Sequence, residues 1–90
     1  MKDFDLIKKD YNVIINFNEQ PNKKVLKKAL TELKVKNIDD VIEEIYMRIR
    51  HYSRINYLEK ENNKLWVWYR SMSEYSEEDC TSLYDIFDNE

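Results

Sequence analysis

The sequence of 90 residues contains no glycine. Loops that cradle phosphates need glycine because the backbone must approach the ligand closely, so P-loop and dinucleotide-binding fingerprints are excluded. Turns that require a positive φ angle must use asparagine or aspartate, which tolerate that conformation best after glycine. Asparagines do gather where breaks in regular structure are expected: Asn16, Asn18, Asn22, Asn37, Asn62 and Asn63.

The composition is that of one small folded domain, residues 1–90. Hydrophobic residues make up 42% of the chain and aromatic residues 13%, and so many aromatics argue against intrinsic disorder. No run of about 18 apolar residues is present, and the first ten residues hold no apolar stretch typical of a secretory signal. The single cysteine, Cys80, cannot form an internal disulfide. We therefore expect a cytoplasmic protein that does not contact a membrane.

The N-terminal half is expected to contain a short helix, a strand and a helical hairpin. Asp3 is expected to cap the short first helix, and alternating apolar residues over 11–17 predict a strand. Apolar residues at helical spacing predict one helix over 22–34 and a second from Asn37, its N-cap, to about residue 52. Because the link between them is short, these helices are expected to be antiparallel neighbours.

The following region is expected to form a β-hairpin. Two runs that suit strands, 54–60 and 64–72, flank a polar turn centred on Asn62 and Asn63. The first run is also compatible with a continuation of the preceding helix to Glu59.

The acidic C-terminal segment, residues 73–90, is expected to form a short helix. Ser76 and Asp79 have the spacing of a capping box at a helix N-terminus. The apolar face of this helix would carry residues at helical spacing: Cys80, Leu83, Tyr84 and Phe87. The expected fold is therefore α+β, in the order (α)βααββα. It would have a small, mainly antiparallel sheet of about three strands, on which the αα-hairpin and the C-terminal helix pack.

Charge is segregated along the chain although the net charge is only -3. Residues 20–37 hold six lysines and one acid, whereas residues 73–90 hold seven acids and no base. Such segments are either ordinary solvated faces or a polarised surface that steers a charged partner.

Candidate catalytic residues lack a suitable context. His51 lies among arginines on an expected helix, and Cys80 follows three acids, which disfavour a reactive thiolate. Paired acids at 39–40, 43–44 and 77–79 fall in the first turns of expected helices, where they offset the helix dipole. No set of residues has metal-ligand spacing. We therefore expect no enzyme activity, no metal and no cofactor.

The only two tryptophans, Trp66 and Trp68, occupy alternate positions of an expected strand. Because successive side chains of a strand face opposite sides, Leu65 and Val67 lie on the other face with Tyr69. If helices cover one side of the sheet, either the tryptophan pair is buried and Tyr69 is exposed, or the reverse. The bulk of tryptophan favours burial of the Trp66 and Trp68 face.

The first functional hypothesis is a non-catalytic inhibitor or interaction module that docks on a basic surface of a larger, nucleic-acid-handling host protein. Aromatic anchors and carboxylates would form its docking surface: Trp66, Trp68, Tyr69, Tyr75, Glu74, Glu77, Glu78 and Asp79. Small inhibitors of host nucleases made by phages and mobile elements, including anti-CRISPR and anti-restriction proteins, are similar in size, composition and one-sided acidity. No motif accompanies that likeness.

The alternative hypothesis is a regulator that binds nucleic acid directly. Its contacts would come from basic residues: Lys23, Lys24, Lys27, Lys28, Arg48, Arg50 and Arg54. The sequence pI of about 5.2 argues against it. A homodimer that uses a tryptophan face is a third hypothesis.

Overall fold

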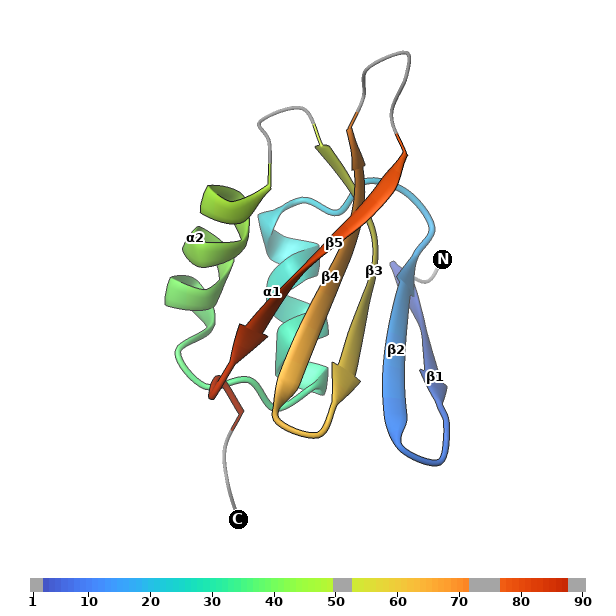
Figure 1. The fold of residues 1–90 in the computed structure, drawn as a ribbon, viewed down its shortest axis with the longest axis vertical. Coiled ribbons are helices and arrows are strands. Elements are labelled where there is room, and N and C mark those ends of the chain that lie inside the picture. The colour runs from blue at the N-terminus through green and yellow to red at the C-terminus, as the bar shows by residue number, and fades with distance from the viewer. Residues whose placement is uncertain (1–2, 50–52, 72–76, 88–90) are drawn as a thin grey trace.

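The computed structural model describes residues 3–49, 53–71 and 77–87, which form one five-stranded sheet and two helices (Figure 1). The strands are β1 (Phe4–Lys8), β2 (Asn12–Phe17), β3 (Ser53–Glu61), β4 (Lys64–Ser71) and β5 (Glu78–Tyr84). The helices α1 (Lys23–Glu32) and α2 (Ile38–Arg48) follow β2 in the chain. Strand order in the sheet follows chain order, and each pair of neighbours is antiparallel.

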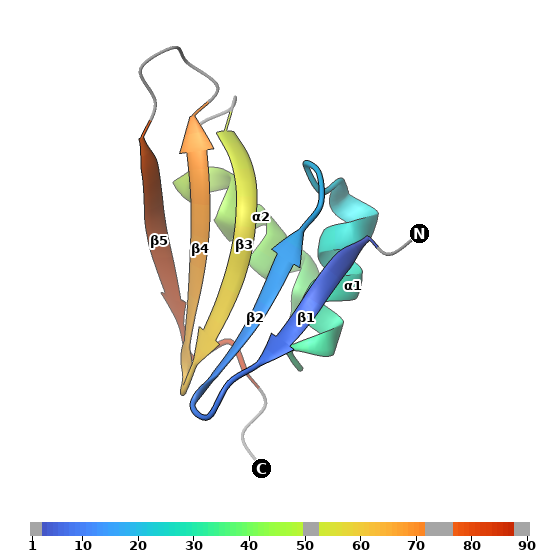
Figure 2. The ribbon, with the colours of Figure 1, turned by 90° about the vertical axis from the view of Figure 1, so that its right-hand side faces the viewer.

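Both helices pack on the same face of the sheet, as the side view in Figure 2 shows. The core lies between these two layers and is almost wholly aliphatic. Its most deeply buried side chains are Ile15, Leu26, Leu30, Ile42, Ile45, Ile55, Leu58, Leu65 and Val67. Burial of this apolar layer is the main force that holds helices and sheet together. Neither of the two described helices covers the opposite face of the sheet (Figures 1 and 2).

The middle of the chain follows the sequence expectations. The strand predicted over 11–17 is β2, and the two predicted helices are α1 and α2, although α2 ends at Arg48. The two runs predicted as a hairpin are β3 and β4, which pair along their length. The alternative in which the second helix continues to Glu59 is therefore wrong.

The predicted fold, with about three strands and a C-terminal helix, is wrong because both ends of the chain add a strand. The N-terminal segment is not a helix capped by Asp3. It is β1, which pairs with β2 from Phe4 opposite Phe17 to Lys8 opposite Val13. The rings of Phe4 and Phe17 meet edge to face with centroids 6.1 Å apart. This cross-strand contact stabilises a hairpin that local helix signals could not reveal.

The predicted C-terminal helix is likewise wrong, because residues 78–84 form the edge strand β5. Apolar spacing at Leu83 and Phe87 suits a helix, but both side chains are also buried when the segment pairs with β4 and then bends. A strand of seven residues gains ladder hydrogen bonds from β4, whereas an isolated helix of that length is marginal. Cys80 consequently lies on a partly exposed strand position and not on the apolar face of a helix. Ser76, the other half of the predicted capping box, lies outside the described residues.

Asparagine does replace glycine at two turns. Asn37 and Asn62 have φ angles of 53°, before α2 and in the β3–β4 turn, and Lys34 and Asp85 also adopt positive φ. Asn37 is the N-cap residue of α2, as predicted, but its side chain makes no capping hydrogen bond. The capping side chain is that of Asn22, which accepts a hydrogen bond of 2.9 Å from the backbone N–H of Val25 at the start of α1.

Candidate interaction surface

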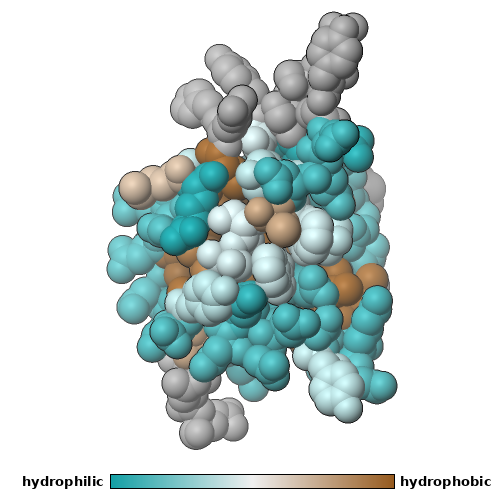
Figure 3. Space-filling model, in the orientation of Figure 1, coloured by the Kyte–Doolittle hydropathy of each residue, from teal (hydrophilic) through white to brown (hydrophobic). Residues whose placement is uncertain are grey.

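The sheet face away from the helices, termed the open face, carries most of the aromatic side chains of β3, β4 and β5. The cross-strand register places Tyr57, Trp68 and Cys80 in one row and Glu59, Trp66 and Ser82 in the next. Glu61, Lys64 and Tyr84 form a third row at one end of the face. In Figure 3 this face shows a central area of intermediate hydropathy surrounded by hydrophilic side chains.

The expectation that Trp66 and Trp68 are buried is wrong. Leu65 and Val67 have no exposed surface, whereas both tryptophans are only partly buried on the open face. Aliphatic side chains fill the thin layer under the helices, and each tryptophan on the open face finds an acceptor for its indole N–H. Tyr69 packs against the core from the helix side of the sheet.

Three aromatic side chains of the open face form a row of adjacent rings, termed the stack. The rings of Tyr57 and Trp68 are 5.5 Å apart at an interplanar angle of 17°, and Trp66 follows 6.4 Å from Trp68 at an angle of 33°. These separations are within the range of favourable aromatic pairs. Because the rings come from two paired strands, the stack is fixed by the β3–β4 register and not by a flexible loop.

Carboxylates hold the two indoles in place. Glu59 accepts a hydrogen bond of 3.2 Å from Nε1 of Trp68 and one of 2.8 Å from the side-chain amide of Asn12. Glu61 accepts a longer one, 3.5 Å, from Nε1 of Trp66. All three donors are neutral, so these bonds orient the carboxylates without cancelling their charge.

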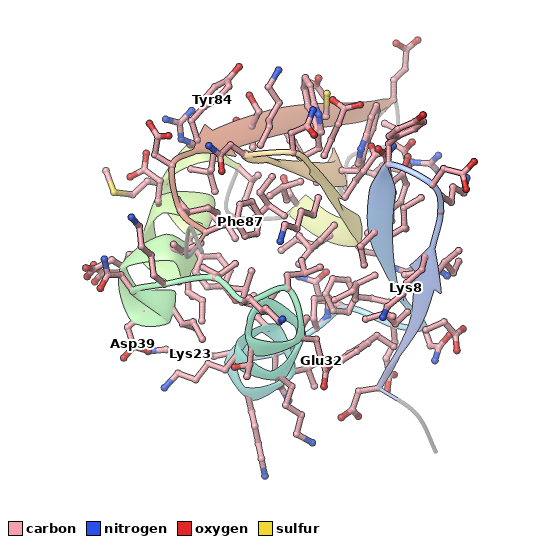
Figure 4. All side chains as sticks on the ribbon, turned by 90° about the horizontal axis from the view of Figure 1, so that it is seen from below. Lys8, Lys23, Glu32, Asp39, Tyr84 and Phe87 are labelled. Atoms are coloured by element: carbon pink, nitrogen blue, oxygen red, sulfur yellow. The ribbon has the colours of Figure 1, made fainter. Side chains whose placement is uncertain are left out.

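At one end of the open face an ammonium group lies against aromatic rings. Nζ of Lys64 is 4.4 Å from the ring centroid of Trp66 and 5.0 Å from that of Tyr84. A hydrogen bond from Lys64, followed by one from Ser82, lowers the pKa of the Tyr84 phenol. Figure 4 shows Tyr84 on the outer side of β5, whereas Phe87 points between sheet and helices.

The other end of the open face is basic. Arg54 and Arg70 face each other across β3 and β4, and both are exposed. Glu78 lies beside Arg70 on β5, but its carboxylate accepts a 2.8 Å hydrogen bond from the Asn56 side chain. Among the described residues, the ion pairs lie off this face, at Lys27–Asp39, Lys28–Asp3 and Arg48–Glu44. The open face therefore presents charges of both signs that no ion pair within the described ranges neutralises.

The acidic half of the predicted docking surface is divided between the two sides of β5. Glu78 belongs to the open face, whereas Asp79 lies on the helix side, where the Tyr69 hydroxyl donates to its carboxylate at 3.5 Å. Glu77 is exposed just before β5. Glu74 and Tyr75 lie outside the described residues.

The basic residues of the alternative hypothesis do not form one surface. Four of them are exposed on α1, away from the open face: Lys23, Lys24, Lys27 and Lys28. Of the other predicted bases, Arg48 pairs with Glu44 on α2 at 2.8 Å, and Arg54 is on the open face. Arg50, like the candidate catalytic residue His51, lies outside the described residues.

Sequence reasoning missed several residues of β3, β4 and β5 that complete the open face. Glu59, Glu61 and Lys64 were assigned no role, and Tyr84 was placed on a buried helix face. The signal for Glu59 and Glu61 was their period-two spacing after Tyr57, which matches that of Trp66 and Trp68. No local signal showed that β5 adds Tyr84 to the same face.

The described surface is hollowed elsewhere. One hollow lies in the loop before α1 and is lined by Asp3, Asn18, Glu19, Gln20, Pro21, Asn22 and Val25. A smaller one lies between α2 and the end of β5, beside Asp40, Glu44 and Asp85. Within 3–49, 53–71 and 77–87, no group of three or more histidine, cysteine, aspartate or glutamate side chains is arranged to hold a metal ion.

Comparisons of the chain with protein-family models, curated proteins and solved structures found no match. Neither described helix is long and apolar enough to span a membrane.

Proposed function

We propose that this protein is a non-catalytic interaction module and that the open face is the surface on which it binds another protein. The observation that carries the proposal is the Tyr57–Trp68–Trp66 stack, held in register on a sheet face that neither α1 nor α2 covers (Figure 2). Tryptophan and tyrosine are enriched among the few residues that carry most of the binding energy of protein interfaces, and a rigid support lowers the entropic cost of binding.

The charges of the open face favour a protein partner over nucleic acid. Glu59 and Glu61 lie beside the rings on which bases would have to stack, and carboxylates there repel phosphates. Arg54 and Arg70, at the opposite end, give the face a second sign of charge. A surface with aromatic residues at its centre and charges of both signs around them is typical of a protein interface.

The narrower part of the proposal is that the partner is a host nuclease or another nucleic-acid-handling protein. The module would then be an inhibitor encoded by a phage or mobile element, of the anti-CRISPR or anti-restriction type, acting in the cytoplasm. Its support is the exposed Glu77 and Glu78 at the edge of the open face, which suit a basic groove.

The experiment is affinity capture with three forms of the chain. The wild type, a Trp66→Ala/Trp68→Ala variant and a Lys23→Ala/Lys24→Ala control are immobilised, and circular dichroism verifies that each is folded. We expect the wild type and the lysine control to retain the same partner and the tryptophan variant to lose it. The proposal would be contradicted if the lysine control lost the partner and the tryptophan variant retained it.

The narrower part has its own test. The captured partner is identified by mass spectrometry and, if it is a nuclease, its activity is measured with increasing amounts of the module. Charge reversal of Glu77 and Glu78 should relieve inhibition. A partner with no connection to nucleic acid, or inhibition that survives this reversal, would remove the inhibitor mechanism. A salt-dependent gel shift with the isolated chain would instead favour direct nucleic-acid binding.

A further inference from the structure

The end of the open face next to the β3–β4 turn already holds a cation. We call this end, formed by Trp66, Tyr84 and Glu61, the cation seat. The ammonium of Lys64 occupies it, 4.4 Å from the Trp66 ring centroid and 5.0 Å from that of Tyr84. Cations are attracted to aromatic ring faces by the quadrupole of the ring, most strongly for tryptophan.

Lys64 contacts the aromatic rings of the cation seat but not its carboxylate. Glu61 is the direct cross-strand partner of Lys64, yet no ion pair joins the two side chains. Among the described residues, the exposed Glu61 carboxylate accepts one side-chain hydrogen bond, the long, 3.5 Å bond from the Trp66 indole. Within the described ranges, the rings thus contact a cation, whereas the Glu61 carboxylate contacts none. Glu59 lies one row further along, and its described donors are neutral.

A guanidinium group could contact the aromatic rings and the Glu61 carboxylate at the same time. It is planar, so it stacks on an aromatic ring, and its fork of N–H donors can simultaneously form two hydrogen bonds with a carboxylate. The compact ammonium of Lys64 can engage the rings or the carboxylate but has no such fork. Lys64 is the first residue of β4 and is partly exposed, so its long side chain can swing into solvent.

We infer that the cation seat binds an arginine side chain of the partner protein, and that Lys64 is a built-in competitor which this arginine displaces. The inference rests on the proposed function, because it assigns the chemistry of the partner at one end of the open face. It also gives the partner an orientation: its arginine meets Glu61, and its acidic groups meet Arg54 and Arg70 at the far end.

The test uses a short peptide with two arginines among alanines, and the same peptide with citrulline, which keeps the shape but loses the charge. The chain has only two tryptophans, so its two indole N–H signals in a nitrogen-proton NMR spectrum report directly on the site. We expect the arginine peptide to shift the Trp66 signal more than that of Trp68, saturably, and the citrulline peptide to shift neither.

Two variants sharpen the test. Lys64→Ala empties the seat, so it should bind the arginine peptide about two- to five-fold more tightly, the size expected for one exposed cation–π contact. Glu61→Gln should weaken binding several-fold. A gain of affinity cannot arise from misfolding, so Lys64→Ala keeps the test decisive even if Glu61→Gln is unstable. Equal binding of the citrulline peptide, no saturable shift, or no gain with Lys64→Ala would each overturn the inference.

The outcome separates this inference from the proposed function. If the Trp66→Ala/Trp68→Ala variant loses the captured partner while the arginine peptide fails to bind, the open face is a docking surface and the arginine assignment is wrong. If the tryptophan variant keeps its partner, the proposed function itself fails.

Discussion

The ring of Tyr57 lies nearly parallel to the indole of Trp68, with centroids 5.5 Å apart, although the two residues belong to different strands. Tyr57 and Trp68 are direct neighbours in the β3–β4 register, just after the irregularity between Ile55 and Tyr57. The extra residue at that point, Asn56, changes the alternation of β3, so that Tyr57 lies on the open face opposite Trp68. This single cross-strand pair therefore links the register of the sheet to its candidate binding surface.

Truncation on the two faces of β4 should separate stability from binding. Trp68→Ala removes two ring contacts and one hydrogen bond on a partly exposed face, so we expect a loss of about 1–2 kcal/mol in unfolding free energy. Leu65→Ala empties a fully buried position and should cost about 2–5 kcal/mol. Urea unfolding measures both losses. Partner capture should be lost with Trp68→Ala and kept by whatever folded fraction of Leu65→Ala remains.

The conformation of residues 78–84 can be tested by substitutions with opposite effects on strands and helices. Alanine is the best helix former but is unfavourable in strands compared with β-branched residues. Thr81→Ala/Ser82→Ala should therefore destabilise the protein by about 0.5–1 kcal/mol if β5 is a strand. Thermal unfolding shows whether the two substitutions lower or raise stability. A rise in stability would indicate the helix that the sequence pattern suggested.

The two asparagines before the helices should respond differently to substitution. Asn22→Ala removes a side-chain cap and should cost about 1 kcal/mol. At Asn37 the constraint is the left-handed backbone, at φ 53°, and the side chain caps nothing. Asn37→Gly should therefore be tolerated, whereas Asn37→Ala should cost about 1 kcal/mol because its Cβ is strained there. Denaturant midpoints for the three variants check the pattern, and a tolerated Asn22→Ala would argue against the cap.

The decrease in unfolding free energy at alkaline pH should depend on Tyr57. Burial, and then the negative charges of Glu78 and Glu59, raise the pKa of its phenol above the ordinary value of 10.0. A group with a raised folded-state pKa contributes stability that is complete below the unfolded pKa and is lost as pH rises through the folded one. Wild type should thus lose more unfolding free energy between about pH 9 and 11 than Tyr57→Phe does. Burial also raises the pKa of Tyr46. The loss of stability at high pH that Tyr46 causes should therefore remain in Tyr57→Phe. Parallel curves for the two proteins would contradict the assignment.

Ionisation of Tyr84 should report whether Lys64 occupies the cation seat. The hydrogen bond from Lys64 is the main reason that the pKa of Tyr84 is lowered, so Lys64→Met should raise it toward 10.0. Ultraviolet absorbance of tyrosinate during a pH titration follows the change, with Tyr84→Phe identifying the signal. An unchanged titration would mean that Lys64 does not hold this position in solution.

The sequence by itself determined the parts of the fold that depend on local pattern. The apolar stripes of α1 and α2 and the alternation of β2, β3 and β4 each contain their own signal, because a helix or a strand repeats its buried positions at a fixed period. Absence of glycine also indicated that asparagine would form turns, as it does at Asn37 and Asn62. The alternate spacing of Trp66 and Trp68 also indicated that the two side chains share one face of a strand.

Only the tertiary structure decided which face of β4 is exposed to solvent and which secondary structure the two terminal segments adopt. β1 and β5 are strands because β2 and β4 offer unpaired edges, and a partner distant in sequence leaves no mark on local periodicity. The helices cover the Leu65 and Val67 side, since aliphatic side chains fill that layer without an indole N–H to satisfy. The open face is therefore a product of strand pairing, which alone brings Tyr57, Glu61, Trp66 and Tyr84 together.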